Sequence, residues 1–304
     1  MRRPQGTPAT VLLLFLAGLL GGPAAAGDEE EGLRRAWDGH RERAAVAGLP
    51  ERLEIRSREG PAEIWAEVLG VLPFPFEVVA AALEATVQWC DFVPLHFNIK
   101  ACVYGLDPGE PFLVLYSGRK GYGTAEDAHR FDYGFAARVA PGPYLGVELR
   151  SQGGPMGTRD YHLRVEALPV EGGTFVRFGS SYGPSRTSRA ATALYLGTLG
   201  RSKMGFSREG EPPVPVRGVR GIVERNGVRY YLALQAFLHT LHLAGEERFE
   251  SGVRTWFDLA SQYPELHETS WETYRRTKRR EREGQLELQR ALEAGGLSAL
   301  PGAR

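Results

Sequence analysis

Six short runs in which apolar and polar residues alternate fill most of the chain between residues 97 and 182. They are Phe97–Val103, Pro111–Ser117, Phe131–Val139, Tyr144–Arg150, Asp160–Ala167 and Thr174–Tyr182. Glycine and proline turns separate the runs, for example Pro141-Gly142-Pro143 and Gly172-Gly173. A period of two with turns at this spacing predicts an antiparallel meander with one buried and one solvated face.

The face predicted to be buried carries tyrosines among its apolar residues. Tyr133 lies beside Phe135 in one run, and Tyr161 lies beside Leu163 in another. A buried tyrosine needs a partner for its hydroxyl group. Such a face suits a ligand pocket, because pockets combine apolar walls with a few polar groups. An ordinary core with satisfied tyrosines has the same pattern, and both interpretations stay open.

The segments around the meander predict one further strand and several helices. Residues Ile64–Leu72 alternate like a strand, and Phe76–Trp89 is rich in alanine and valine, as in a helix. A short helix is expected at Ser188–Leu196, followed by a proline-rich loop at Pro212–Pro215.

A long helix is predicted from Val219 to Leu241, where apolar residues recur at helical spacing. Asn226-Gly227 is also a hairpin signal, but the helical pattern continues past it, so we favour the helix. Arg225 and Tyr230 lie within it. Its charged residues fit either a solvated edge or groups that orient a ligand.

The chain begins with the pattern of a secretory signal peptide. Arg2 and Arg3 precede the apolar run Val11–Leu20, and three alanines end at Ala26. An uncleaved N-terminal anchor is the alternative. Cleavage after residue 26 removes two arginines and no acid, which leaves 35 basic and 37 acidic residues and a net charge of −2. We expect a soluble periplasmic or secreted protein.

This charge has consequences for partners, and the expected compartment has consequences for the cysteines. A nearly neutral chain gives no basic footprint for nucleic acid. Cys90 and Cys102 are the two cysteines of the chain. In an oxidising compartment they can pair and join a helix end to the next strand. Two buried thiols are the alternative, because a sequence does not show whether the Cα atoms are close enough to bridge.

The C-terminal segment, residues 245–304, is predicted to be helical and amphipathic. It contains the charged run Arg275–Glu283. Mixed charges at helical spacing usually form a solvated helix face. A transient contact with anionic lipid is the alternative.

No catalytic or metal site is predicted. Ser181 lies in Gly179–Gly183, which matches G-x-S-x-G, but a nucleophile elbow needs a parallel strand that leads into a helix. His239 and His242 are three residues apart on the long helix without a third ligand nearby. No phosphate loop or dinucleotide fingerprint is present, so no cofactor is expected.

Three stretches of sequence resemble the START and SRPBCC superfamily. They are "GVLPFPFEVVAAALEATVQWCDFVPLHFNIKACVYG", "GGPMGTRDYHLRVEALPVEGGTFVRFGSSY" and "RGIVERNGVRYYLALQAFL". The resemblance covers residues 61–244, after a polar lead-in at residues 27–60 that holds a short helix around Gly32–Ala47. It implies an α+β helix-grip fold, in which a curved antiparallel sheet wraps a long C-terminal helix. Residues 245–304 are then a helical extension.

The resemblance also implies a cavity between the sheet and the long helix. We therefore expect a binding or carrier protein for a lipid or another apolar small molecule. The expected ligand-binding residues are Tyr133, Phe135, Tyr161, Leu163, Arg225 and Tyr230. The loop Gly118–Asp127 or the C-terminal extension is expected to gate entry. The oligomeric state is not predicted.

Two alternatives use the same residues differently. An enzyme of this fold, a cyclase or hydrolase, would need a titratable group in the cavity, such as His129, Asp132 or Glu224. A cavity-free interaction protein would use the C-terminal helix to bind a partner.

Overall fold

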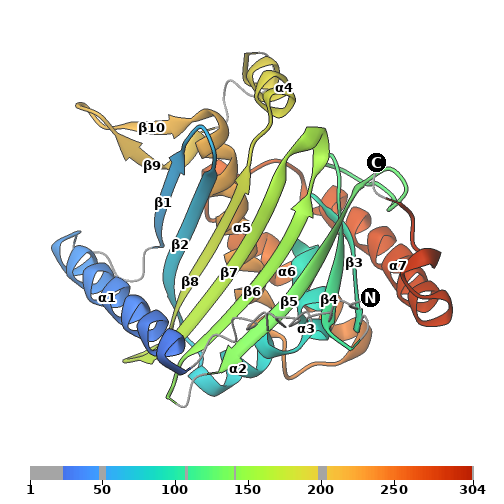
Figure 1. Cartoon of the computed structure of the whole chain (residues 1–304), viewed down its shortest axis with the longest axis horizontal. Helices are drawn as coiled ribbons and strands as arrows, with labels where there is room; N and C mark the ends of the chain where they lie inside the picture. The colour runs from blue at the N-terminus through green and yellow to red at the C-terminus, as the bar shows by residue number, and fades with distance from the viewer. Residues whose placement is uncertain (1–22, 48–52, 107–108, 140–141, 198–203, 303–304) are drawn as a thin grey trace, which may run out of the picture.

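The structure is a computed structural model that describes residues 23–47, 53–106, 109–139, 142–197 and 204–302. Eight antiparallel strands form its main sheet (Figure 1). Their order across the sheet is β1-β2-β8-β7-β6-β5-β4-β3. The strands are β1 (Glu54–Glu59), β2 (Ile64–Leu72), β3 (Ile99–Leu106), β4 (Pro111–Ser117), β5 (His129–Val139), β6 (Leu145–Gly153), β7 (Arg159–Val170) and β8 (Gly173–Gly183). The predicted meander is therefore confirmed, and every neighbouring pair in it is antiparallel.

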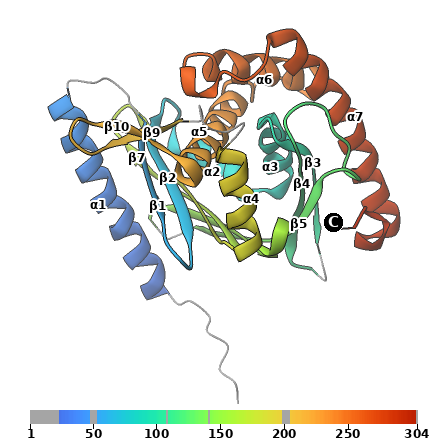
Figure 2. The same ribbon diagram turned by 90° about the horizontal axis from the view of Figure 1, so that it is seen from above.

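One face of the sheet, here called the inner face, is covered by α5 (Gly218–His239) and the helices around it (Figure 2). These are α2 (Phe76–Glu84), α3 (Thr86–Phe92) and α6 (Gly245–Ala260). Alternate residues of each strand point inward, so Phe131, Tyr133 and Phe135 of β5 join one core cluster with Val228 and Leu232 of α5. A curved sheet closed by a long helix is the helix-grip arrangement that the resemblance implied.

The single helix predicted at Phe76–Trp89 is two helices. α2 ends at Glu84 and α3 starts at Thr86, and the axes bend by 98° at this break. Ala85 adopts an extended conformation between them. Among the described residues no single helix combines the length and apolar character of a membrane span, although α2 and α3 together pass by length and composition.

The opposite, outer face carries α1 (Pro23–Ala47), which starts earlier than the predicted helix at Gly32–Ala47. Residues 1–22 of the predicted signal peptide lie outside the described residues. Leu33 is fully buried against Leu69, Tyr144 and Phe175. The expected lead-in is therefore packed structure, and it also contains β1, which pairs with β2.

A small hairpin occupies the place of the predicted proline-rich loop. β9 (Met204–Glu209) pairs with β10 (Val214–Arg217) near α4 (Arg186–Gly197) (Figure 1). Glu224 of α5 holds this hairpin. Its carboxylate is fully buried and accepts hydrogen bonds from the backbone N–H groups of Phe206 at 2.7 Å and Ser207 at 3.0 Å.

The C-terminal extension is helical, as predicted, and its last long helix packs against the main sheet. α7 (Trp271–Gly295) lies along the edge strand β3. Gln285 donates to the Cys90 carbonyl at 3.0 Å and accepts from the Cys102 N–H at 2.9 Å. Gln289 makes the same pair of bonds to Tyr104, at 3.1 and 3.2 Å. The two amides thus satisfy the backbone groups of Cys102 and Tyr104 that the open edge of β3 would expose.

Part of the charged run Arg275–Glu283 is buried, contrary to the expected solvated face. Lys278 and Glu281 are 2% and 5% exposed. Glu281 pairs with Lys278 at 2.7 Å and with Lys100 of β3 at 3.0 Å. The pair between Lys100 and Glu281 joins α7 to β3, while Arg276, Arg279 and Glu283 remain exposed.

Cys90 and Cys102 form a disulfide, with Cα atoms 5.0 Å apart. It joins the end of α3 to β3, at the position where Gln285 contacts both residues. Four 3₁₀ turns complete the described structure: η1 (Val93–Leu95), η2 (Pro155–Gly157), η3 (Pro264–Leu266) and η4 (Leu297–Ala299).

Candidate functional site

Aromatic side chains from β5, β7 and β8 line part of the inner face. The rings of Tyr161 and Tyr182 stack at 5.2 Å. Phe131 packs edge-on against Tyr161 at 4.9 Å and lies 6.0 Å from Tyr133. The Tyr161 hydroxyl is 2.8 Å from the Thr158 hydroxyl. The result is an apolar surface that also offers phenolic hydroxyl groups.

Tyr230 continues this surface from the helix side. Its ring stacks on Phe178 of β8 at 5.7 Å and on His96 at 4.3 Å. Burial raises the pKa of the Tyr230 hydroxyl and that of the Tyr133 hydroxyl. Both tyrosines are therefore neutral hydrogen-bonding groups in any physiological buffer.

The predicted pocket residues differ from the rest of the inner face in exposure. Phe135 and Leu163 keep 8% of their surface accessible and Tyr133 keeps 5%, whereas Leu149 and Val165 have none. Tyr161 and Tyr230 are intermediate. All five are interior side chains that belong to or pack against one core cluster.

A group of basic residues lies on the neighbouring side of α5. The Glu268 carboxylate pairs with Arg225, with Arg229 at 2.9 Å and with Lys120 at 2.5 Å. Arg225 and Arg229 are each 3% exposed. Burial opposes ionisation of Glu268, but Arg229, Lys120 and Arg225 outweigh it and lower its pKa from 4.5 to about 2. We call these four residues the arginine cluster.

His96 lies between the arginine cluster and the buried ion pairs that Lys100 and Lys278 form with Glu281. Burial lowers the pKa of His96 well below its usual range, and the charges of Arg229, Lys278 and Lys100 lower it further. Its imidazole is therefore neutral. Burial likewise lowers the pKa of Lys278 to about 8, against the attraction of Glu281.

Five of the six predicted ligand residues lie in or against the main hydrophobic core. Tyr133, Phe135, Tyr161, Leu163 and Tyr230 belong to or pack against the same core cluster. Arg225 lies apart from them, in the arginine cluster. The sequence did not predict that His96, Lys120, Arg229 and Glu268 belong to the site. These residues come from four separate segments, and only the fold brings them together.

The three titratable residues proposed for an enzyme occupy different surroundings. Glu224 holds the β9–β10 hairpin. Asp132 is exposed and pairs with Arg130 at 2.8 Å. His129 is half-buried, and its ring packs edge-on against Phe131 at 4.8 Å, so it lies beside the aromatic surface.

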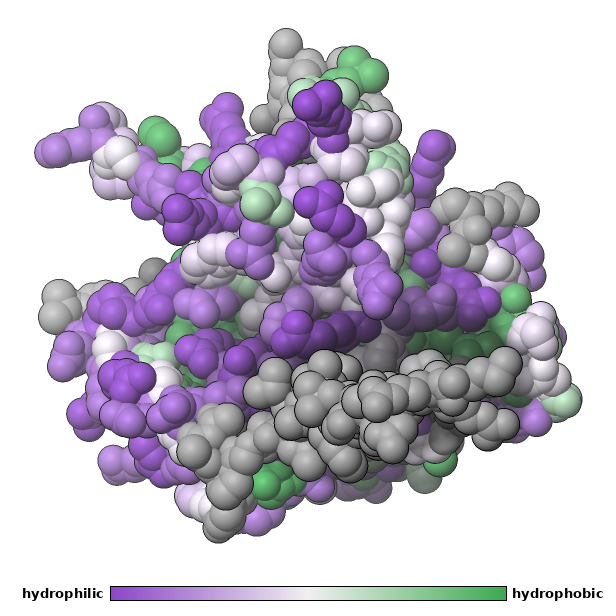
Figure 3. All heavy atoms as spheres, viewed as in Figure 1, coloured by the Kyte–Doolittle hydropathy of each residue, from purple (hydrophilic) through white to green (hydrophobic). Residues whose placement is uncertain are grey.

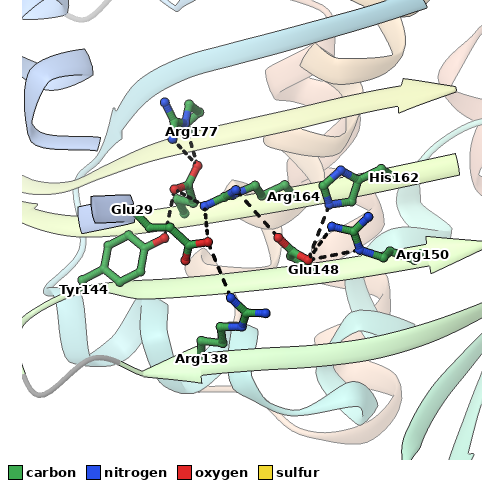
Figure 4. Close-up of polar contacts among 9 residues, drawn as sticks. Glu29, Arg138, Tyr144, Glu148, Arg150, His162, Arg164 and Arg177 are labelled. Atoms are coloured by element: carbon green, nitrogen blue, oxygen red, sulfur yellow. Dashed lines mark hydrogen bonds and ion pairs between the residues drawn. The ribbon is translucent and has the colours of Figure 1, made fainter. Parts of the chain in front are cut away.

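The outer face carries a separate polar network (Figure 4). Glu166 is 1% exposed and bonds Arg164, Arg177 and the Tyr144 hydroxyl at 2.9, 2.5 and 2.9 Å. Glu29 of α1 reaches Arg164 at 3.3 Å. The network therefore attaches α1 to the sheet. Hydrophilic residues dominate this side of the molecule (Figure 3).

Ser181 also lies on the outer face, opposite His162 in the β7–β8 register. Glu148 is 3.8 Å from His162, but in the described part of the chain no hydrogen bond joins Ser181 to His162. Since β8 is antiparallel to its neighbours and α4 begins only at Arg186, the described segment is not the strand–turn–helix of a nucleophile elbow.

His239 packs against Phe74, and the described residues hold no group of three or more potential metal ligands from His, Cys, Asp and Glu.

Comparison with known proteins gives matches among solved structures alone. No family model and no curated protein matches this chain. A protein of Thermus thermophilus is 14% identical with a TM-score of 0.37, over 58% of this chain and 97% of its own. The Zhui aromatase/cyclase of Streptomyces sp. R1128 is 11% identical with a TM-score of 0.37, over 63% and 98%. Ara h 8.0201 is 9% identical with a TM-score of 0.36, over 62% and 99%.

Proposed function

We propose that this protein binds an apolar small molecule, such as a lipid, between the inner face of the sheet and α5. The observation that carries the proposal is the accessible surface kept by Tyr133, Phe135, Leu163 and Tyr230 inside the core. An apolar ligand that buries about 200 Å² against these side chains gains about 5 kcal/mol before ordering costs. The neutral hydroxyls of Tyr133 and Tyr230 would orient its polar end.

We propose that it acts after export, in the periplasm or outside the cell. The signal-peptide pattern of residues 1–26 supports this, and so does the Cys90–Cys102 disulfide, because disulfides persist in oxidising compartments. A carrier in such a compartment would keep an apolar molecule out of water between two membranes or surfaces.

The test is native mass spectrometry of the protein purified from a bacterial periplasm, followed by solvent extraction and titration with a neutral fluorescent apolar probe. We expect a stoichiometric extra mass that extracts as a lipid, or one-to-one uptake of the probe. Leu163→Phe adds bulk on the accessible surface and should reduce uptake several-fold. Leu286→Phe, at an exposed position of α7, is the matched control and should bind normally.

Absence of both a bound molecule and probe uptake by the folded protein would refute the proposal. Equal uptake by the parent, Leu163→Phe and Leu286→Phe would show that the probe binds elsewhere. Circular dichroism of each variant establishes that the folds are comparable.

A further inference from the structure

The arginine cluster holds more positive than negative charge in a buried place. Arg225, Arg229 and Lys120 all pair with the one carboxylate of Glu268. Glu281, a buried acid of α7, already pairs with Lys100 and Lys278. Buried charges are costly unless they are paired and hydrogen-bonded, so two guanidinium groups that share one carboxylate are incompletely paired and can bind another anionic group.

Arg225 also has a hydrogen-bond donor that the described residues leave unused. Its Nε atom is buried and has no hydrogen-bond partner among the described residues. Arg229 uses Nη1 to bond the Asn226 side chain at 3.2 Å. A guanidinium group binds a carboxylate or phosphate best with two parallel N–H groups, and Glu268 alone does not supply two such contacts to both arginines.

The arginine cluster also adjoins the proposed ligand surface. Asn226, Arg229 and Tyr230 lie on one side of α5, at spacings of three and four residues. Tyr230 stacks on Phe178 of the inner face, while Arg229 borders a cavity of about 20 Å³ that Glu268 and Phe97 also line. A molecule with its apolar part near Tyr230 would thus have its polar end near Arg229.

Glu268 is placed so that it can leave. It lies between η3 and α7, outside any helix or strand. Lys120, its third partner, is in the β4–β5 connection, and its side chain is 36% exposed. Moving Glu268 therefore requires rearrangement of two connecting segments and leaves the sheet, α5 and α7 intact.

We propose that the ligand is an anionic amphiphile whose carboxylate or phosphate binds Arg225 and Arg229 in place of Glu268. The inference rests on the proposed function and narrows its ligand class. Glu268 acts as an internal competitor that pairs with both arginines when the ligand is absent. Entry of the anionic group releases the segments that carry Glu268 and Lys120 from α5.

The experiment compares four probes in binding to the full mature protein by isothermal titration calorimetry. Dodecanoate and dodecyl phosphate carry the two anionic groups, dodecanol carries neither, and inorganic phosphate lacks the apolar chain. We expect both anionic amphiphiles to bind at least tenfold more tightly than dodecanol. We expect inorganic phosphate to bind at least a hundredfold more weakly than dodecyl phosphate.

Variants identify the residues responsible. Glu268→Gln removes the competitor and should tighten the binding of both anionic amphiphiles about tenfold, with dodecanol unchanged. Arg225→Lys keeps the charge but loses the paired N–H groups, and should weaken the anionic amphiphiles several-fold. Arg276→Gln, at an exposed position of α7, is the matched control and should leave all affinities unchanged.

The outcomes separate the two proposals. Equal binding of dodecanol and the anionic amphiphiles, unaffected by Glu268→Gln, would overturn the inference and leave the proposed function standing. Binding of inorganic phosphate as tight as that of dodecyl phosphate would also overturn it. No binding of any alkyl probe to the folded protein would refute the proposed function itself.

Discussion

Replacement of Gln285 by leucine should destabilise the protein strongly, although the new side chain is apolar and of similar size. Gln285 is 5% exposed and bonds two backbone groups of different segments, the Cys90 carbonyl and the Cys102 N–H. Leucine leaves both groups buried without a partner. Each such group costs about 1–3 kcal/mol. Allowing for the added apolar contact, we expect a loss of about 2–4 kcal/mol in the free energy of unfolding.

The assay is urea unfolding of the mature protein with the disulfide intact, followed by tryptophan fluorescence. Gln289→Leu breaks the equivalent bonds to Tyr104, but Gln289 is only half-buried, so water can replace them. We expect a smaller loss of about 0.5–1.5 kcal/mol. Glu287→Gln, exposed on the same helix, should change stability by less than about 0.5 kcal/mol.

The order of the three variants is the decisive result. If Gln285→Leu costs no more than Glu287→Gln, the two amide bonds do not fix α7 to β3. If Gln289→Leu costs more than Gln285→Leu, burial does not control the loss.

Two further predictions concern covalent and ionic contacts. The double variant Cys90→Ser and Cys102→Ser should lose about 2–3 kcal/mol, because the disulfide closes a short loop with a sequence separation of 12; equal urea midpoints for parent and variant would contradict this. Glu268 has a folded pKa of about 2 against an ordinary value of 4.5, so it stabilises the fold above pH 4.5 and this contribution is lost as the pH falls towards 2. Glu268→Gln should reduce the fall in melting temperature between pH 4.5 and pH 2. An unchanged fall in the variant would show that Glu268 does not cause it.

The strands and α5 could be predicted because their signal is local. Residues 97–182 alternate along each strand, and the apolar pattern of α5 passes through Asn226-Gly227 without a break. β1 was missed because its sequence, Glu54–Glu59, is mostly charged and only half-buried, so it shows no apolar alternation. The apolar residues of this strand pair lie mainly in its partner, β2.

The division between α2 and α3 had no sequence signal either. Ala85 is a good helix former, and no glycine or proline marks the bend. Packing of Val79, Leu83, Trp89 and Phe92 in the core accompanies the break, together with the Trp89 bond to the Leu83 carbonyl at 2.8 Å. Tertiary contacts overrode the local preference.

The aromatic part of the candidate site could be predicted, and the charged part could not. Tyr133, Tyr161 and Tyr230 follow the periods of their own strands and helix. The burial of Lys278 and Glu281 depends instead on Lys100, which is 181 residues from Glu281. Glu268 likewise meets Arg225 only because the segment after α6 returns to α5.

The distance along the chain between β3 and its cover also determines when the sheet can be completed. Cys102 and Gln285 are separated by 183 residues. At a synthesis rate of about 5–20 residues per second, a nascent chain carries β3 for roughly 10–40 s before Gln285 has been made. During that interval the backbone of β3 is available to strands of other chains. Folding that waits for α7, or a holding chaperone, would avoid intermolecular pairing at this edge.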